Sequence, residues 1–300
     1  MDLSIIILSY NTKDITNECL NRLQLSVDSC QKNIGNKIQV IVLDNASSDG
    51  SAETIRKNHP WVELIESKEN TGYSKGNNLA LKKAKNPLIL FLNSDVYVEE
   101  DTLELALNYF KNPGVDALGV KLKFEKGKFQ PSAGNLPNPF NIPLWILGLS
   151  KIPGISLINP YHPTDKSYFS QISPVGWVTG AFFMIRKEVL DKVGGFDENL
   201  FMYAEEVELC QRIKNAGFKI WYVPTITVTH LHGASSNFDT SPAFVQELKG
   251  LKYFFKKYYS SWYFLVKLFL IKGLMLRVIV FSFLGKTKRA KAYIDGLKVI

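Results

Sequence analysis

The chain has 300 residues, of which 46% are hydrophobic and 12% are aromatic. This composition supplies a large apolar core and excludes a globally disordered protein. The formal net charge of +8 is unevenly placed, because residues 246–300 contain twelve Lys or Arg and only two acids, which leaves −2 for residues 1–245. A near-neutral main part argues against a nucleic-acid-binding groove, whereas the basic tail predicts contact with an anionic surface.

The cysteines and the first apolar run predict the compartment. Cys19, Cys30 and Cys210 are odd in number and lack the spacing of metal ligands, so a reducing environment is expected. A strand-like run already begins at Leu3, which leaves no room for a signal peptide. We therefore expect a cytoplasmic protein.

The first third of the chain alternates short apolar runs with helix-length segments. The runs cover residues 3–8, 38–43, 61–65 and 88–92, and each is typical of a strand buried on both faces. Strands separated by helices predict a doubly wound α/β fold whose strand ends share one edge, where ligands bind. The polar residues that gather at these ends are Asn11, Asp44, Asn45, Asp49, Asn77 and Asp95.

The fourth run ends in Asn93-Ser94-Asp95. Asp95, with Asn93 on the same side of the strand, can hold a hard divalent cation through oxygen, and through that cation a diphosphate. Asp is also a favoured helix cap, so a capping role at a helix that begins near Glu99 is an equal alternative from this stretch alone. The chain contains no GxGxxG after its first run and no GxxxxGK[ST], which argues against dinucleotide-binding and P-loop sites.

Four segments, LSIIILSYNT, VIVLDNASSDGS, ENTGYSKGNN and LILFLNSD, together resemble the nucleotide-sugar-binding half of family 2 glycosyltransferases with the GT-A fold. The bacterial rhamnosyltransferase-like members are the most similar. The resemblance implies that Asp44 contacts the nucleobase or ribose of a nucleoside diphosphate sugar. The residues expected to contact that donor are Ser9, Tyr10, Asn11, Asp44, Asn45, Gly72, Asn77, Asn93, Ser94 and Asp95.

One departure from the family pattern concerns the metal. Asn93-Ser94-Asp95 stands where such enzymes carry Asp-x-Asp, so Asn replaces the first acid. The resemblance implies that Asp95 remains the direct ligand of Mg²⁺ or Mn²⁺. Whether Asn93 contributes only a hydrogen bond to ribose stays open.

The middle of the chain changes in composition. Residues 124–175 contain eight prolines, together with Trp145, Tyr161 and Tyr168, and such a long loop region inside a compact domain is usually functional or disordered. The apolar patch at residues 142–149 predicts a short helix that contacts lipid or acceptor. A cover over the sheet edge is the alternative.

Residues 177–186 predict one buried strand, and Glu205 and Glu206 begin a helix, where the macrodipole favours acids of any role. The segments VTGAFFMIR, GGFDE and FMYAEEVELCQRI resemble the acceptor-side motifs of the same family, whose Glu-Asp pair supplies the catalytic base. The resemblance implies that Glu206 is the base, with Glu205 as the next candidate. It also implies acceptor contacts at Trp177 and Gly180.

His230 and His232 form an HxH pattern, which directs both rings to one side of an extended chain. The resemblance implies that His230, with His232 as second choice, completes the metal or diphosphate site. Ser235 and Ser236 are candidate donors to phosphate oxygens.

The C-terminal segment is apolar from Trp262 to Leu284, but Lys267, Lys272 and Arg277 interrupt it. Three cations argue against a spanning helix, and their spacing of five spreads them around a helix rather than along one stripe. We expect helices that lie on an anionic cytoplasmic leaflet. A homodimer interface is the alternative.

The predicted fold is therefore α/β, a Rossmann-like GT-A sheet, mostly parallel and flanked by helices, with a basic helical appendage. Residues 1–240 form the catalytic domain, divided into a nucleotide-sugar half (1–123) and an acceptor half (124–240), and residues 241–300 form the appendage. The expected activity is inverting, metal-dependent transfer of rhamnose from dTDP-rhamnose to a hydroxyl of a lipid-linked glycan in cell-surface polysaccharide synthesis. UDP-hexose and UDP-N-acetylhexosamine are alternative donors, and a non-catalytic glycan- or lipid-binding module is the alternative class.

Overall fold

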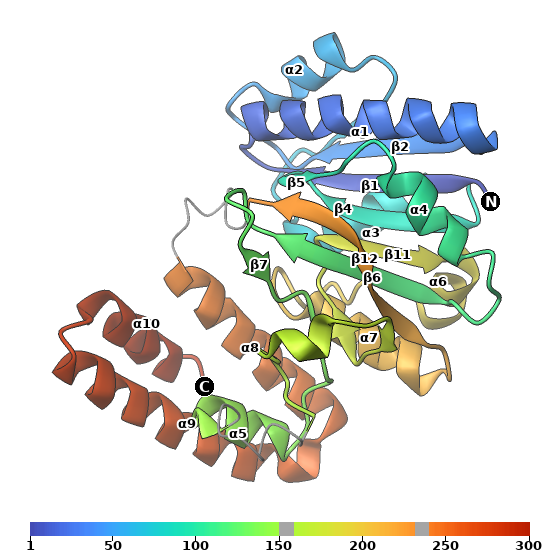
Figure 1. Cartoon of the computed structure of the whole chain (residues 1–300). Coiled ribbons are helices and arrows are strands. Elements are labelled where there is room, and N and C mark those ends of the chain that lie inside the picture. Colours follow the sequence, from blue (N-terminus) through green and yellow to red (C-terminus); the bar gives the residue numbers. More distant parts are fainter. Residues whose placement is uncertain (150–158, 232–239) are drawn as a thin grey trace.

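The computed structural model describes residues 1–149, 159–231 and 240–300. These residues form a mixed sheet with helices on both faces, and a helical C-terminal part extends to one side (Figure 1). In the described part of the chain the sheet runs β3 (Glu63–Glu66), β2 (Ile38–Asp44), β1 (Leu3–Ser9), β4 (Leu88–Asn93), β11 (Phe182–Arg186), β6 (Ala117–Lys123), β12 (Ile220–His230), β5 (Val96–Tyr97).

The four N-terminal strands are parallel, as the apolar runs predicted. Ser9 lies beside Asp44, and Leu8 lies beside Asn93, so the polar residues that follow these strands meet at one edge. β11 is antiparallel to both β4 and β6, and it joins the two halves of the sheet. The mixed sheet and its helices confirm the predicted α/β class.

Each face of the sheet is covered by its own set of helices. Along β1, Ile5 and Ile7 pack into one apolar cluster and Ile6 into the other, because successive side chains of a strand point to opposite faces. The first face carries α1 (Lys13–Ile34), α2 (Ser51–Asn58) and α4 (Thr102–Tyr109). The second face carries α3 (Gly72–Leu81), α6 (Lys187–Val193) and α7 (Glu205–Asn215).

The prediction of one strand over residues 177–186 was wrong. The chain forms β10 (Trp177–Val178), which pairs with β8 (Ala133–Gly134) in a separate small sheet, and it enters β11 only at Phe182. Between them, Thr179 N–H donates to Ser132 O, and Gly180 has the Tyr73 hydroxyl against it. The apolar pattern was correct, but these long-range contacts turn the backbone.

The proline-rich segment contains short elements rather than one open loop. The remaining elements there are β7 (Phe129–Gln130), α5 (Asn141–Ile146), η3 (Lys166–Phe169) and β9 (Ser173–Pro174). Ile142 and Ile146 are buried, and Gly273 of the C-terminal part packs directly on Ile146. The patch is therefore covered by another helix, and it lies neither in solvent nor over the sheet edge.

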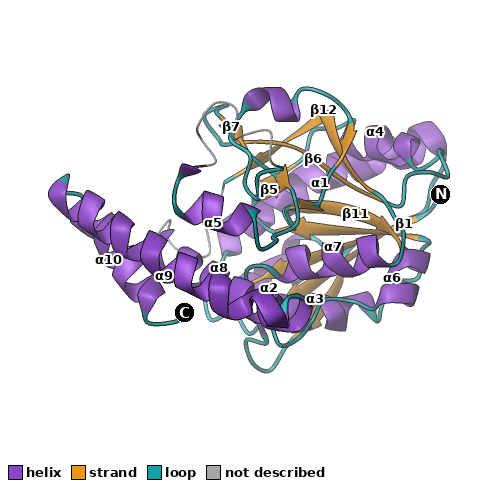
Figure 2. Ribbon diagram, turned by 90° about the horizontal axis from the view of Figure 1, so that it is seen from below, coloured by secondary structure: helices purple, strands orange, loops and turns teal. Residues whose placement is uncertain are grey.

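The C-terminal part consists of α8 (Thr240–Tyr258), α9 (Ser260–Phe283) and α10 (Thr287–Leu297), which confirms the helical appendage. α8 packs against the α/β body through Leu248 and Leu251, whereas α9 and α10 extend away from the sheet (Figure 2). The division of the chain near residue 240 stays a prediction. Among the described helices, none contains a segment long and apolar enough to cross a membrane.

Candidate active site

A cavity of about 340 Å³ opens at the carboxyl ends of β1 and β4. The nucleotide-side predictions that line it are Tyr10, Asn45, Gly72, Asn93, Ser94 and Asp95. The acceptor-side and metal-site predictions that line it are Gly180, Glu205, Glu206 and His230. Residues that are up to 220 positions apart in the sequence therefore surround one space.

Other predicted residues lie behind this lining. Ser9 shares hydrogen bonds with Thr12 and Thr16, and Asn77 donates to the Tyr73 carbonyl. Asn11 accepts from Ser48 N–H. These side chains hold the loops that carry the lining residues.

Asp44 and Trp177 also lie outside the cavity lining. Asp44 Oδ2 accepts from Ser47 N–H, while its buried Oδ1 has no hydrogen-bond partner in the described part of the chain and stays available to a donor group. The Trp177 indole N–H lies within reach of the carbonyls of Asn135 and Tyr161, and the ring packs in the core. His232, Ser235 and Ser236 lie outside the described residues.

The floor of the cavity is held by Asn45 and a glycine. Asn45 accepts from Thr71 N–H and donates to Asn70 Oδ1, which fixes the turn before α3. Gly72 has φ of +77°, and a Cβ there would lie 2.6 Å from the Phe201 ring. Only glycine fits this contact without strain, so the backbone can approach a ligand closely.

The candidate metal site follows from the pairing of β5 with β12. This pairing sets His230 beside Val96, and Leu231 N–H donates to the Asp95 carbonyl. As a result, His230 Nε2 lies 3.3 Å from Asp95 Oδ1. Because β5 follows Asp95 directly and α4 begins only at Thr102, the capping role for Asp95 is excluded.

The polar groups around His230 fit a divalent cation. Gln130 Nε2 lies 3.0 Å from His230 Nδ1, and the buried Gln130 Oε1 has no hydrogen-bond partner among the described residues. With the Gln130 amide turned over, its Oε1 accepts from His230 Nδ1–H, and His230 Nε2 then carries the lone pair that would bind a metal. No group of three or more His, Cys, Asp or Glu gathers as a metal site in the described ranges.

The acidic pair begins α7 after an unusual turn. Tyr203 and Ala204 have φ of 71° and 70°, a left-handed conformation that is costly for residues other than glycine. The turn directs Glu205 and Glu206 to the cavity, and each has a buried Oε2 without a hydrogen-bond partner in the described part of the chain.

Burial shifts the protonation of both acids. It raises the pKa of Glu206 to about 7, and together with the neighbouring Glu206 it raises the pKa of Glu205 well above its usual range. A carboxylate with a pKa near the working pH can accept and release a proton efficiently. The arrangement therefore suits general base chemistry.

Tyr73 is a site residue that the sequence reasoning missed. Its hydroxyl lies 3.3 Å from Asn93 Oδ1 and 3.2 Å from the Gly180 carbonyl, so it joins the two halves of the site. Burial, and then the charges of Glu205, Glu206 and Asp95, raise the pKa of Tyr73 well above its usual range. The position of Tyr73 next to Gly72, within the ENTGYSKGNN segment, could have marked it as a site residue. The exposed Phe201 and Met202, just before the acidic pair, are further lining residues.

Two curated relatives are similar over most of the chain. The N-acetylglucosaminyl-diphospho-decaprenol L-rhamnosyltransferase of Mycobacterium tuberculosis is 27% identical over 243 residues, which are 75% of this chain and 77% of the relative. Rhamnosyltransferase WbbL of Escherichia coli is 27% identical over 256 residues, which are 82% of this chain and 89% of the relative.

Two solved structures share the fold. The mannosyltransferase PcManGT of Pyrobaculum calidifontis, in complex with GDP-Man and Mn²⁺, matches with a TM-score of 0.57 at 18% identity, over 85% of this chain and 63% of that chain. Staphylococcus aureus TarS 1–349, in complex with UDP, matches with a TM-score of 0.54 at 17% identity, over 100% of this chain and 90% of that chain. At these identities the likeness concerns the fold alone.

The mixed sheet, its flanking helices and these neighbours define a protein of the GT-A class. The model of the family described as glycosyl transferase family 2 matches residues 4–194, and the chain belongs to this family. The protein is thus a glycosyltransferase, and the predicted likeness to rhamnosyltransferases is confirmed.

Proposed function

We propose that the protein transfers a sugar, with inversion at the anomeric carbon, from a nucleoside diphosphate sugar to a hydroxyl of a lipid-linked glycan. The observation that carries the proposal is the meeting of Asp95, His230 and Glu206 around one cavity of about 340 Å³. The donor is dTDP-rhamnose, which is supported by the names of the two relatives, and UDP-hexose and UDP-N-acetylhexosamine are the next candidates. Family membership favours this enzyme over a non-catalytic binding module.

The residues divide the chemistry between the two halves of the cavity. Asn45 and the Gly72 backbone hold the nucleotide, with Asp44 Oδ1 as a free acceptor nearby. Glu206 takes the proton from the attacking hydroxyl, and its raised pKa near 7 matches that task. Asp95 and His230 would hold Mg²⁺ or Mn²⁺, which when bound offsets the charge that develops on the leaving diphosphate.

The lipid-linked acceptor is supported by one relative, whose name specifies a diphospho-decaprenol substrate. Such an acceptor belongs to the synthesis of a cell-surface polysaccharide. It would present its sugar at a membrane, so the enzyme must work at a lipid surface on the cytoplasmic side.

A transfer assay across a panel of dTDP- and UDP-sugars, with Mg²⁺ or Mn²⁺, tests this function. We expect turnover with a dTDP-sugar and loss of activity in excess chelator. Asp95→Ala should remove both activity and ion dependence, whereas Asp101→Asn, at an exposed acid without a capping hydrogen bond, is the matched control. Full activity in excess chelator would exclude the metal role, and no turnover with any dTDP-sugar would exclude the donor.

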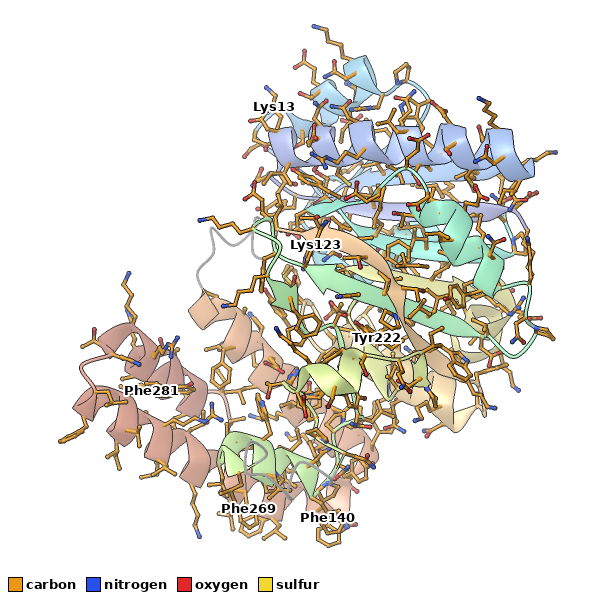
Figure 3. All side chains as sticks on the ribbon, in the orientation of Figure 1. Lys13, Lys123, Phe140, Tyr222, Phe269 and Phe281 are labelled. Carbon is orange, nitrogen blue, oxygen red and sulfur yellow. The ribbon has the colours of Figure 1, made fainter. Side chains whose placement is uncertain are left out.

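We also propose that α9 seats the enzyme on an anionic membrane surface. Helix α9 buries one side against α5 and exposes a row of large apolar side chains on the other, including Ile279 and Phe283, which is 91% exposed. Phe140, which packs against Trp262 at the start of α9, also points away from the body of the molecule (Figure 3). The apolar members of the row are Leu265, Leu268, Leu276, Ile279 and Phe283.

Charge distinguishes a membrane from a second copy as the occupant of this row. Lys272 is exposed within the row, and exposed cations follow it. A two-fold dimer would gather the lysines of both copies at one interface, whereas anionic lipid would pair with them. Arg277 does not contribute, because it donates to the carbonyls of Trp145 and Ile146 and so ends α5.

Co-sedimentation with vesicles tests the surface. We expect binding to phosphatidylglycerol-containing vesicles, weakened by salt and by Ile279→Glu, and no binding to pure phosphatidylcholine. Leu105→Glu, at an exposed leucine on α4, is the control. If the protein binds neither kind of vesicle and light scattering shows a dimer, the apolar row on α9 is instead the interface with a second copy.

A further inference from the structure

Helix α8 contacts the turn before the acidic pair through a glycine. A Cβ on Gly250 would lie 2.5 Å from the Ala204 Cβ and 2.8 Å from the Tyr203 carbonyl oxygen. Tyr203 and Ala204 hold left-handed backbone conformations, which persist only where the surrounding structure fixes them. The backbone of α8 is therefore one of the surfaces that keep Glu205 and Glu206 directed at the cavity.

A second contact fixes α7 one turn further on. Lys257 Nζ lies 2.7 Å from both Asp197 Oδ2 and Glu208 Oε1, and the Tyr258 hydroxyl donates to the same Glu208 oxygen. The Glu208 side chain is fully buried, and Arg212 donates to both of its oxygens. A buried carboxylate paired on several sides locks the two helices in one arrangement.

A third contact, between Glu247 and His162, places two charged groups near Glu206. Glu247, on the same side of α8 as Gly250, lies 2.7 Å from the Nε2 atom of His162. The His162 ring is held between aromatic rings. Its centroid lies 4.1 Å from that of the Tyr161 ring and 5.2 Å from that of the Trp177 ring. This packing fixes the orientation of the pair, which is only partly exposed.

The two charges of the pair act on Glu206 in opposite directions. Burial makes the largest contribution to the raised pKa of Glu206, and its own backbone N–H lowers that pKa. Beyond these, the Glu247 carboxylate raises the pKa of Glu206 and the His162 charge lowers it. A pair with this geometry sets the charge around the base without touching the substrate.

Other titratable groups face Glu206 but do not vary in charge near neutral pH. Burial raises the pKa of Cys210 to about 12, and it raises the pKa of each nearby tyrosine. The groups concerned are Cys210 on α7, Tyr203 before it, Tyr73 on α3 and Tyr161 beside His162. The charged groups that act on Glu206 from outside its own helix are thus Glu247 and His162.

We propose that Glu247 and His162 form a positioning pair for the catalytic base Glu206, so that α8 belongs to the catalytic machinery. The proposal rests on the proposed function, in which Glu206 takes the acceptor proton. Gly250 seats the base-bearing turn on α8, and Glu247, one turn earlier on the same side of α8, holds His162 and sets with it the electrostatic field around Glu206. Neither residue lines the cavity, so the pair acts on the base and not on the acceptor.

The pH profile of kcat/KM for sugar transfer tests the pair with the full-length enzyme. The acidic limb reports the base of the free enzyme. We expect Glu247→Gln to move this limb to lower pH and His162→Gln to move it to higher pH, each by about half a unit or more. The double variant should return close to the wild-type limb. Glu188→Gln, at an exposed acid on α6, is the matched control and should leave the limb unchanged.

A merely structural role predicts a different result. Loss of packing lowers the amplitude of the profile in both variants, but it does not move their limbs in opposite directions. Because folding stability itself changes with pH, the folded fraction is measured at each pH and the profile is normalised to it. Limbs that move in one direction, or that do not move, would overturn the proposal. Should Glu206→Gln keep most of its activity, the base assignment itself fails, which is a separate outcome.

Discussion

Replacing Glu206 with Gln tests the assignment of the base through activity and through stability. Gln resembles the protonated carboxyl in shape but cannot accept a proton, and loss of a general base lowers turnover by roughly 10²–10⁴-fold. Nucleotide affinity should stay unchanged, because the edge formed by β1, β2 and β4 is intact. Transfer assays and UDP or dTDP titrations measure the two effects separately.

The stability effect follows from the raised pKa of Glu206. Burial raises this pKa from 4.5 to about 7, so the folded protein holds the proton more tightly than the unfolded chain does. The resulting stability is fully present below pH 4.5 and is lost as the pH rises through about 7. This difference corresponds to roughly 3 kcal/mol, an upper value because Glu205 shares the same site.

Glu206→Gln should therefore be more stable than the wild type at pH 8 and equally stable near pH 4. For a chain of 300 residues, the gain at pH 8 corresponds to about 5 °C in Tm. Urea unfolding at both pH values, with Glu188→Gln as a control at an exposed acid, measures the difference. Equal stability at both pH values would refute the reasoning that Glu206 carries a buried carboxylate oxygen without a compensating partner. If kcat is largely retained, Glu205 becomes the candidate base.

Three further substitutions test the nucleotide and metal sides of the cavity. Gly72→Ala should weaken UDP or dTDP binding about tenfold or more. The reason is that a Cβ at this position, where φ is +77°, would lie 2.6 Å from the Phe201 ring. An unchanged affinity in calorimetry would contradict this prediction. Asn93→Asp should lower the Mn²⁺ concentration needed for half-maximal activity, whereas an unchanged requirement indicates that Asn93 serves only Tyr73. Gln130→Leu should weaken Mn²⁺ binding in the presence of UDP by about 10–100-fold by releasing the His230 ring, and unaltered binding would show that Gln130 does not orient this ring for a metal.

The nucleotide edge of the site was predictable because strand ends in a parallel sheet are in register. Once residues 3–8, 38–43 and 88–92 are recognised as strands, Asp44 and Asn93 must lie at the same edge as Ser9. This inference needs only the period of the apolar pattern and the rule for ligand sites in such sheets.

The acceptor side was less accessible to sequence reasoning. Trp177 was expected to contact the acceptor, yet it packs beneath the cavity lining against His162. The proline-rich segment has no periodicity that distinguishes a buried aromatic from an exposed one. Tyr73 was overlooked for a related reason, because its hydroxyl meets Gly180 only through contacts between residues 107 positions apart.

The three acids in the first turn of α7 show why environment, rather than position, separates a base from a structural carboxylate. Glu208 is as deeply buried as Glu205, and burial alone would raise its pKa, but hydrogen bonds from Arg212, Lys257 and Tyr258 lower it. Glu205 and Glu206 lack such partners among the described residues, and their pKa values are raised. Helix α7 thus carries Glu208, whose hydrogen bonds tie the helix to α8, and two acids without such partners, Glu205 and Glu206, which face the cavity. Neighbouring carboxylates whose surroundings move their pKa values apart are the pattern expected of a site that titrates near neutral pH.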